Sequence, residues 1–245
     1  MCYNVSIKKI SKKTEKQFKA KIDSEITLPD NYYLSGFSHQ LVPVISSLNP
    51  ELITAFNWGL IPDFCKTDID AKDMQAKTLN AKSETVFALP SFKNSIREKR
   101  CLIIVDGFYE WRTIGKQKYP YFIQYKDREA FALGGIFNDW VNKQTGEQTH
   151  TCSIITTPAN ALMSKIHNEK QRMPFILPKG MEREWLNTNL KENEITDLMK
   201  PLPDGELIAH TISKLITNKN KNPNTPEVQL AFEYPELEFI DALES

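Results

Sequence analysis

The residue with the most distinctive chemistry in this sequence is Cys2, because it directly follows Met1. Methionine aminopeptidases remove Met1 when the second residue is small, and the mature chain then begins with a 1,2-aminothiol. The α-amine of such a group titrates near ~7.7–8.0 and its thiol near ~8.5. Toward an aldehyde, the amine forms an imine and the thiol then closes a five-membered thiazolidine. Judged by position alone, an ordinary second residue is the simpler interpretation.

A second concentration of reactive groups lies in the segment Cys101–Arg112, which reads CLIIVDGFYEWR. Glu110 stands there among aromatic residues, and a carboxyl group in apolar surroundings has a raised pKa that suits a general acid or base. Strand alternation places Glu110 on the face of Phe108, with Tyr109 and Trp111 on the opposite face. An exposed glutamate on the polar face of a strand is the alternative.

Four further residues are candidates that the sequence leaves open when each is taken alone. His167 follows a helical pattern and forms a nucleophile pair with Cys2 if the two meet in space, although a capping or packing histidine is commoner. In LNAKSETV, Asn80 can orient a substrate and Lys82 can hold a phosphate, or both can be loop surface. Trp58 in WGLIP can stack on bases, as in single-strand binders, or pack in the core.

Charge and composition exclude several classes of protein. The 245 residues include 31 Lys and Arg against 31 Asp and Glu, so any nucleic-acid site has to be a local patch. The chain starts basic and ends acidic, which two solvated faces also explain. The basic residues are Lys8, Lys9, Lys12, Lys13, Lys16, Lys19 and Lys21; the acidic ones are Glu227, Glu233, Glu236, Glu238, Asp241 and Glu244.

Targeting signals and metal motifs are not found in the sequence. No secretory signal or membrane-length apolar run is present, which predicts a cytoplasmic protein without a membrane partner. The cysteines at 2, 65, 101 and 152 show no CxxC spacing, so we expect neither a metal, nor a cofactor, nor disulfides.

Short β-rich runs and turn signals dominate the middle of the chain. Tyr119–Tyr125 and Ala130–Phe137 are predicted to form a hairpin about Lys126-Asp127-Arg128, and Phe175–Leu177 is predicted as an edge or isolated strand between two prolines. Further predicted strands are Leu102–Val105, Phe108–Arg112 and Thr151–Thr156. Predicted helices are Glu15–Lys21, Ser91–Glu98 with Ser91 as N-cap, Pro158–Ile166, Glu182–Asn187 and Glu194–Met199.

These elements predict an α+β protein built mainly on antiparallel sheet with short peripheral helices. No Pro-, Gly- or Ser-rich break divides the chain. We therefore expect a single domain over residues 1–225, followed by an acidic tail over residues 226–245.

A set of segments occurs together and in one order, and it resembles the SOS-response-associated peptidase (SRAP) family of abasic-site processing proteins. DGFYEW, an initial Met-Cys and a later IHN and RMP are the most specific of them. The resemblance runs from Cys2 to about Trp185 and is weaker to about Asn218. The segments are Met1-Cys2, WGLIP, NAKSETV, PSF, RCLIIVDGFYEW, PYFI, FALGGIF, IITTPAN, IHN and RMPFIL.

The resemblance implies a barrel-like fold, a groove for single-stranded DNA and a thiazolidine crosslink to abasic sites, formed after self-removal of whatever precedes the cysteine. It implies that Cys2 is the nucleophile and that Asn80 positions the amino terminus and the open sugar. It further implies that Glu110 is the acid and base, that His167 assists proton transfer, and that Arg172 meets a phosphate beside the lesion.

Three positions depart from the family pattern and concern the grip on DNA. Asn4 takes the place of an arginine that contacts phosphate, and Lys82 takes the place of another, keeping its charge but not its bidentate fork. Four residues rather than one separate His167 from Arg172, so Lys170 is a second candidate for the phosphate contact. The four expected catalytic positions are unaffected.

The main hypothesis is therefore a monomeric enzyme that binds single-stranded DNA containing abasic sites and is nucleoid-associated when bound. The alternative is a thiol peptidase acting on other proteins, with Cys2 and His167 as a dyad. Since Met1 alone precedes Cys2, self-cleavage would release one residue, as an aminopeptidase would. A non-enzymatic DNA-binding module with an incidental cysteine is the third reading.

Overall fold

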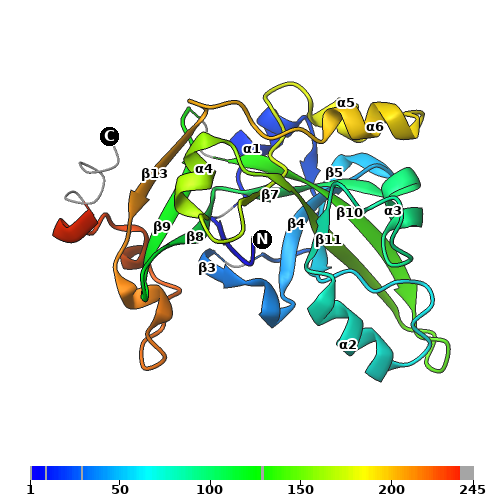
Figure 1. Cartoon of the computed structure of the whole chain (residues 1–245). Coiled ribbons are helices and arrows are strands. Elements are labelled where there is room, and N and C mark those ends of the chain that lie inside the picture. Colours follow the sequence, from blue (N-terminus) through cyan, green and yellow to red (C-terminus); the bar gives the residue numbers. More distant parts are fainter. Residues whose placement is uncertain (1, 9, 29, 128–129, 238–245) are drawn as a thin grey trace.

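Two β-sheets lie side by side in the computed structural model, with short helices around them (Figure 1). The structure describes residues 2–237 except 9, 29 and 128–129. Some of the expectations concern residues outside this described part, namely Met1, Lys9, Arg128 and the acidic residues from 238 onward.

Five strands form a closed barrel. They pair antiparallel in the order β5-β4-β7-β10-β11, and a parallel contact between Cys152 on β11 and Trp58 on β5 closes the ring. Three short strands attach to it: β2 and β12 at the edges, and β6 alongside β11. The bounds are β4 Leu41–Ser46, β5 Asn49–Trp58, β7 Arg100–Val105, β10 Phe131–Val141, β11 Gln148–Pro158, β2 Lys21–Ile22, β6 Asn80–Lys82 and β12 Arg172–Pro174.

The second sheet has five strands, all antiparallel, in the order β13-β9-β8-β1-β3. Only Asp106 separates β7 of the barrel from β8 of this sheet, so one stretch of chain connects the two. The bounds are β1 Asn4–Ile7, β3 Asn31–Ser35, β8 Gly107–Ile114, β9 Gln117–Tyr125 and β13 Leu207–Thr211. The prediction of an α+β, barrel-like fold with peripheral short helices is confirmed.

Alternation along the strands separates two hydrophobic cores. On β7, Ile103 joins the core that links the barrel to the second sheet and contains Cys2, whereas Leu102 joins the core beneath helices α3, α5 and α6. On β8, Phe108 faces the core of Cys2, and Tyr109 packs into a smaller cluster on the opposite face. The predicted alternation about Glu110 is thus confirmed.

Two helices, α3 and α4, begin later than predicted. Helix α3 starts after Phe92 rather than at a Ser91 cap, and α4 starts only after Asn160, whose Oδ1 accepts from the Met163 amide at 3.0 Å. Residue Pro158 is the last residue of β11, which shortens α4. The helices are α1 Lys12–Phe18, α2 Asp68–Lys77, α3 Lys93–Glu98, α4 Ala161–Ile166, α5 Glu182–Trp185 and α6 Glu192–Leu198, with 3₁₀ turns η1 Gly36–Ser38, η2 Lys214–Thr217 and η3 Pro226–Gln229.

Two predictions about strand pairing need correction. β9 and β10 do not form the predicted hairpin: β9 pairs with β8 and β13, whereas β10 pairs with β7 and β11. Alternation identifies strands but not their partners, and here the chain crosses from one sheet to the other between them. The predicted strand Phe175–Leu177 is a single bridge of Ile176 to Leu133, just after β12.

The predicted tail is partly packed against the second sheet. Val228 is fully buried, and Tyr234 and Leu237 are buried beside Tyr119. These residues belong to the folded body, whereas the boundary placed at residue 225 stays a prediction. Among the described residues, no helix has the length and apolar character needed to span a bilayer.

Candidate active site

Cys2 lies where the second sheet meets the barrel, two residues before β1. Its side chain is fully buried. The Asn80 side chain on β6 donates from Nδ2 to the Cys2 carbonyl oxygen at 2.8 Å, and the Cys2 thiol faces the Asn4 carbonyl oxygen at 3.9 Å. The barrel and the sheet therefore both fix the backbone of the candidate nucleophile, and the sequence-based expectation that Asn80 meets the amino terminus agrees with this contact.

The electrostatic setting of the Cys2 thiol differs from the expected one. Burial, and next the neighbouring carboxyl group of Glu110, raise the pKa of the Cys2 thiol far above its ordinary range. In this structure the thiol therefore holds its proton at neutral pH, in contrast to the ordinary value of ~8.5 assumed from the sequence. Any attack by this sulfur therefore requires a neighbouring group that can accept the thiol proton.

Glu110 is the carboxyl group whose ionisation acts on the Cys2 thiol. It projects from β8 and is 5% exposed, so the alternative of a solvent-facing glutamate is wrong. Burial raises the pKa of Glu110 to about 8, partly offset by the positive charge of the amino terminus. At neutral pH the carboxyl group is therefore mostly protonated, and it can act as a general acid and then, once ionised, as a base.

His167, the residue after α4, faces this carboxyl group. Its Nδ1 lies 2.8 Å from the Arg172 carbonyl oxygen, which can only accept, so Nδ1 carries the proton of the neutral ring. Nε2 lies 3.8 Å from Glu110 Oε2. Burial lowers the pKa of His167, so carboxyl and imidazole form an uncharged pair at neutral pH and can pass a proton between them.

Asn80 carries an acceptor that the described residues leave unused. Its Oδ1 is buried and has no hydrogen-bond partner among them, although Nδ2 is bonded to Cys2. A buried acceptor without a partner costs about 1–3 kcal/mol. The amide oxygen is therefore available to a donor that arrives at the site, such as an ammonium group or a hydroxyl group.

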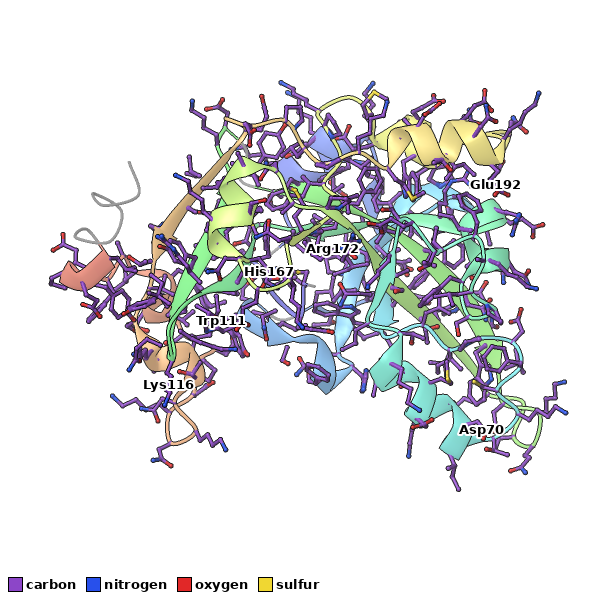
Figure 2. All side chains as sticks on the ribbon, viewed as in Figure 1. Asp70, Trp111, Lys116, His167, Arg172 and Glu192 are labelled. Atoms are coloured by element: carbon purple, nitrogen blue, oxygen red, sulfur yellow. The ribbon has the colours of Figure 1, made fainter. Side chains whose placement is uncertain are left out.

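Arg172 is near His167 in the structure but is already paired (Figure 2). Its guanidinium group forms a two-pronged ion pair with Glu84 and donates to the Thr156 carbonyl oxygen at 2.6 Å. Glu84 could not be identified from the sequence, because nothing in NAKSETV indicates a partner 88 residues away. A phosphate contact by Arg172 competes with this carboxylate.

The longer spacing between His167 and Arg172 is accommodated by a turn fixed to β8. Asn168 donates from Nδ2 to the Thr113 carbonyl oxygen at 2.7 Å and accepts from the Thr113 amide at 3.0 Å. Gln171 adopts a left-handed conformation with φ of 53°. The His167 ring therefore faces Glu110 despite the extra residues. Lys170 is exposed on the surface.

The predicted DNA contacts fall on different kinds of surface. Lys82 is exposed, and the Asn4 side chain accepts from the Tyr33 hydroxyl group at 2.8 Å. Trp58 is 1% exposed and its indole donates to the Leu79 carbonyl oxygen at 2.9 Å. The prediction of Trp58 as a base-stacking platform is therefore wrong: it packs in the core and its polar edge is satisfied.

An aromatic pair that the sequence did not reveal, one ring exposed and the other partly buried, lies beside Cys2. Phe37 in η1 is 58% exposed, and its ring centroid is 5.1 Å from that of Tyr3. The Gly36 amide donates to the Tyr3 carbonyl oxygen at 2.8 Å, which holds the two together. Alternation could not reveal this pair, because its partners belong to separate segments of the chain.

Among the described residues, no group of three or more His, Cys, Asp or Glu side chains is arranged so that it could hold a metal ion. The site's chemistry consists of a thiol, a protonated carboxyl group, an imidazole and an amide.

Fold and site together define a β-barrel protein with a cysteine near its amino end set against a buried carboxyl group. The chain belongs to the SOS response associated peptidase (SRAP) family, whose model matches residues 1–219. It is 35% identical over 207 residues to the abasic site processing protein YoqW of Bacillus subtilis, and the alignment covers 82% of this chain and 88% of YoqW.

More distant relatives and solved structures agree with this assignment. The abasic site processing protein HMCES of Gallus gallus is 34% identical over 198 residues, covering 72% of this chain and 56% of HMCES. A crystal structure of a protein from Bacteroides thetaiotaomicron superposes with a TM-score of 0.88 at 35% identity, over 95% of this chain and all of that one. The fold is also shared by a Bordetella bronchiseptica protein, with a TM-score of 0.73 at 22% identity, over 86% of this chain and all of that one.

Proposed function

We propose that this protein processes abasic sites in single-stranded DNA by forming a thiazolidine crosslink through Cys2 once the preceding residue is removed. The observation that carries the proposal is the convergence of Cys2 and the proton-holding Glu110, with Asn80 bonded to the Cys2 backbone. The names of the relatives, abasic site processing proteins, support the choice of substrate.

The reaction balances with the groups present. The ring-opened abasic sugar offers an aldehyde, and the free α-amine of Cys2 adds to its carbon. The carbinolamine then loses its hydroxyl group as water with a proton from Glu110, giving an iminium ion. The Cys2 thiol adds to the iminium carbon, and its proton passes to the ionised Glu110, which restores the acid. The sum is aldehyde plus aminothiol giving thiazolidine plus water.

The surface beside Cys2 suits a single strand. The exposed Phe37 ring, which contacts the partly buried Tyr3, offers an aromatic face on which a neighbouring base can stack, a contact worth about 1–3 kcal/mol per base. Lys82, and Arg172 once it leaves Glu84, supply positive charge to phosphates. Such contacts release counterions, so binding weakens with salt.

A thiol peptidase is the second candidate function, because Cys2 and His167 both belong to the candidate site and a thiol with an imidazole is the usual pair for peptide cleavage. Burial, however, and next the Glu110 carboxyl group, raise the pKa of the Cys2 thiol. This leaves little thiolate to attack a peptide, and we assign peptide cleavage at most to self-processing.

An abasic-site oligonucleotide separates these functions. Incubated with single-stranded DNA carrying one abasic site, the purified protein is expected to form an adduct that survives denaturation, with intact mass showing loss of Met1 and of one water. An undamaged strand of the same sequence is the control. Peptide turnover without an adduct would favour the peptidase, and salt-sensitive binding without an adduct would favour a binding module.

Neutralising Glu84 should strengthen DNA binding. Glu84→Gln removes the carboxylate that occupies Arg172, so we expect affinity for single-stranded DNA to rise about threefold to tenfold at low salt and the salt slope to steepen by about one contact. Fluorescence anisotropy over a salt series measures both. Glu51→Gln, which breaks the exposed pair of Glu51 with Arg183 at 3.0 Å, is the matched control. Equal slopes in the two variants would show that Arg172 does not reach DNA.

A further inference from the structure

The last part of the described chain crosses the second sheet from one edge to the other. Residues 224–234 are termed the C-terminal strap. At the β3 edge, the Asn224 side chain accepts from the Tyr33 amide at 3.3 Å. At the β13 edge, the Phe232 amide donates to the Thr211 carbonyl oxygen at 2.9 Å. The strap begins after residue 219, where the match to the family model ends.

The strap lies on the face of the sheet opposite Cys2. Val228 is fully buried against Tyr109 and Phe122. Their neighbours along the chain, Phe108 among them, point to the other face and pack in the core that contains Cys2. The strap therefore covers the back of β8, which carries the candidate acid Glu110, and of β9 beside it.

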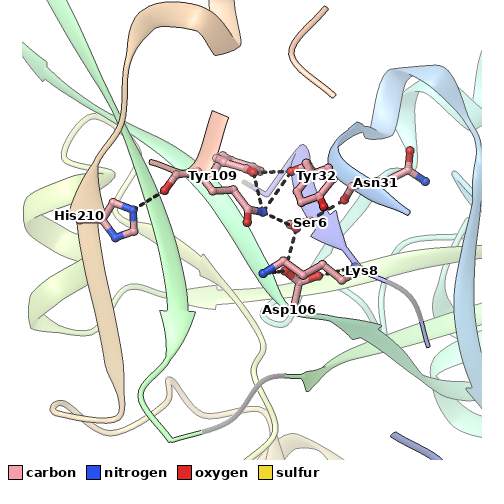
Figure 3. Close-up of polar contacts among 8 residues, drawn as sticks. Ser6, Lys8, Asn31, Tyr32, Asp106, Tyr109 and His210 are labelled. Atoms are coloured by element: carbon pink, nitrogen blue, oxygen red, sulfur yellow. Dashed lines mark hydrogen bonds and ion pairs between the residues drawn. The ribbon is translucent and has the colours of Figure 1, made fainter. Parts of the chain in front are cut away.

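One side chain of the strap, Gln229, bonds to Ser6 on β1 and to Tyr109 on β8, and Figure 3 shows the polar contacts around Ser6 and Tyr109. Its Nε2 donates to Ser6 Oγ at 2.7 Å and to the Tyr109 hydroxyl oxygen at 3.3 Å. Ser6 in turn donates to Asp106 Oδ2 at 2.8 Å, and the Tyr109 hydroxyl donates to the Tyr32 carbonyl oxygen. Each hydroxyl group uses its only proton there, so both can only accept from Gln229.

The backbone of Gln229 is held as well. The His210 ring on β13 donates from Nε2 to the Gln229 carbonyl oxygen at 2.8 Å. The glutamine is thereby fixed between the β13 edge and the middle of the sheet, and its amide cannot turn away from Ser6 without breaking contacts on both sides.

We propose that Gln229 is a positioning residue that acts through Ser6 and Tyr109, holding β1 and hence Cys2 in place against β8 and Glu110. The pairing of β1 with β8 consists of Val5 with Phe108 and Ser6 with Gly107. β1 is held on its other side by β3, but its ladder to β8 is short, and Gln229 adds a side-chain link between these two strands at Ser6, four residues from Cys2. The inference rests on the proposed role of Cys2 as the nucleophile.

Gln229→Glu tests this with almost no change in volume. The carboxylate would face two hydroxyl oxygens that have no proton left to give, and it would lie beside the buried Asp106. We expect the crosslinking rate at saturating DNA to fall about tenfold, since misplacement by 1 Å can cost ~10²-fold, while DNA affinity changes less than about twofold. Gln117→Glu, an exposed change on β9, should leave both unchanged. Gln229→Leu, which removes the donor without adding charge, should slow crosslinking less than Gln229→Glu.

A second measurement works without DNA. Alkylation by iodoacetamide, followed by peptide mass analysis, compares Cys2 with Cys101 and Cys152, which are equally buried in β7 and β11. A rise of about tenfold or more at Cys2 alone supports positioning of β1. Equal rises at all three cysteines would mean that Gln229 only stabilises the fold, and unchanged protection of Cys2 would also overturn the proposal. If the unaltered protein forms no adduct, the proposed function fails, while alkylation still decides the role of Gln229.

Discussion

Cys2→Ala is expected to abolish the denaturation-resistant adduct while leaving noncovalent affinity for single-stranded DNA within about twofold. The change removes one buried sulfur atom and no charge, so the phosphate contacts that dominate affinity are retained. The α-amine remains, and an amine alone forms an imine that water reverses. Denaturing gels with an abasic-site oligonucleotide measure the adduct, and anisotropy on the same samples measures binding.

Two further variants make this result specific to the Cys2 position. Cys2→Ser retains a nucleophile but one much weaker than sulfur, and it should give at most an adduct that is lost unless borohydride traps the imine. Cys65→Ala removes a buried thiol from a separate cluster beside Trp140 and should crosslink normally. A stable adduct in Cys2→Ala would assign the chemistry to a lysine instead.

Much of the site could be predicted because its signals are local. Cys2 is notable for its place in the chain, and the strand period alone put Glu110 on the face of Phe108, where the structure buries it. The raised pKa of Glu110 follows from that burial. Family membership, inferred from ordered motifs, is confirmed by the match over residues 1–219, whereas the catalytic roles stay predictions.

What could not be predicted depends on contacts between distant segments. The pairing of Arg172 with Glu84 and the contact of Gln229 with Ser6, 223 residues apart, leave no pattern in the sequence. For Trp58 the sequence predicted a DNA contact that the structure does not support. An aromatic residue before Gly-Leu-Ile-Pro gives the same sequence pattern whether it faces DNA or the core. Only the closed barrel, in which Trp58 pairs with Cys152, decides between these.

Burial of the thiol changes what the proton carrier has to do. Since the pKa of Cys2 is held far above neutrality, sulfur cannot wait as a thiolate, and its proton has to leave as the carbon–sulfur bond forms. A carboxyl group with a pKa of about 8 can donate to the departing hydroxyl group and, now ionised, receive the thiol proton. One group thus serves both steps, and His167 at 3.8 Å can relay the proton between them.

The pH dependence follows from the direction of this shift. Because the pKa of Glu110 is raised from its ordinary value of 4.5 to about 8, its acid form is present at neutral pH and is lost as pH rises through about 8. The α-amine, with an ordinary pKa of ~7.7–8.0, must instead lose its proton to attack. Crosslinking should therefore show a bell-shaped profile with its maximum near pH 8 and a descending limb that belongs to Glu110.

Glu110→Gln should remove that descending limb and slow the reaction in both directions. The amide keeps the shape and can still donate a hydrogen bond, but it cannot cycle a proton, so crosslink formation and crosslink release should each fall about 10²–10⁴-fold. Affinity for DNA should be little changed, because the side chain is buried. Rates measured from pH 6 to 9.5 test both effects, with the exposed Glu147→Gln as the control. Wild-type rates in Glu110→Gln would show that Glu110 is not the proton carrier and would assign that role to His167. A slowed rate with an unaltered descending limb would assign that limb to another group.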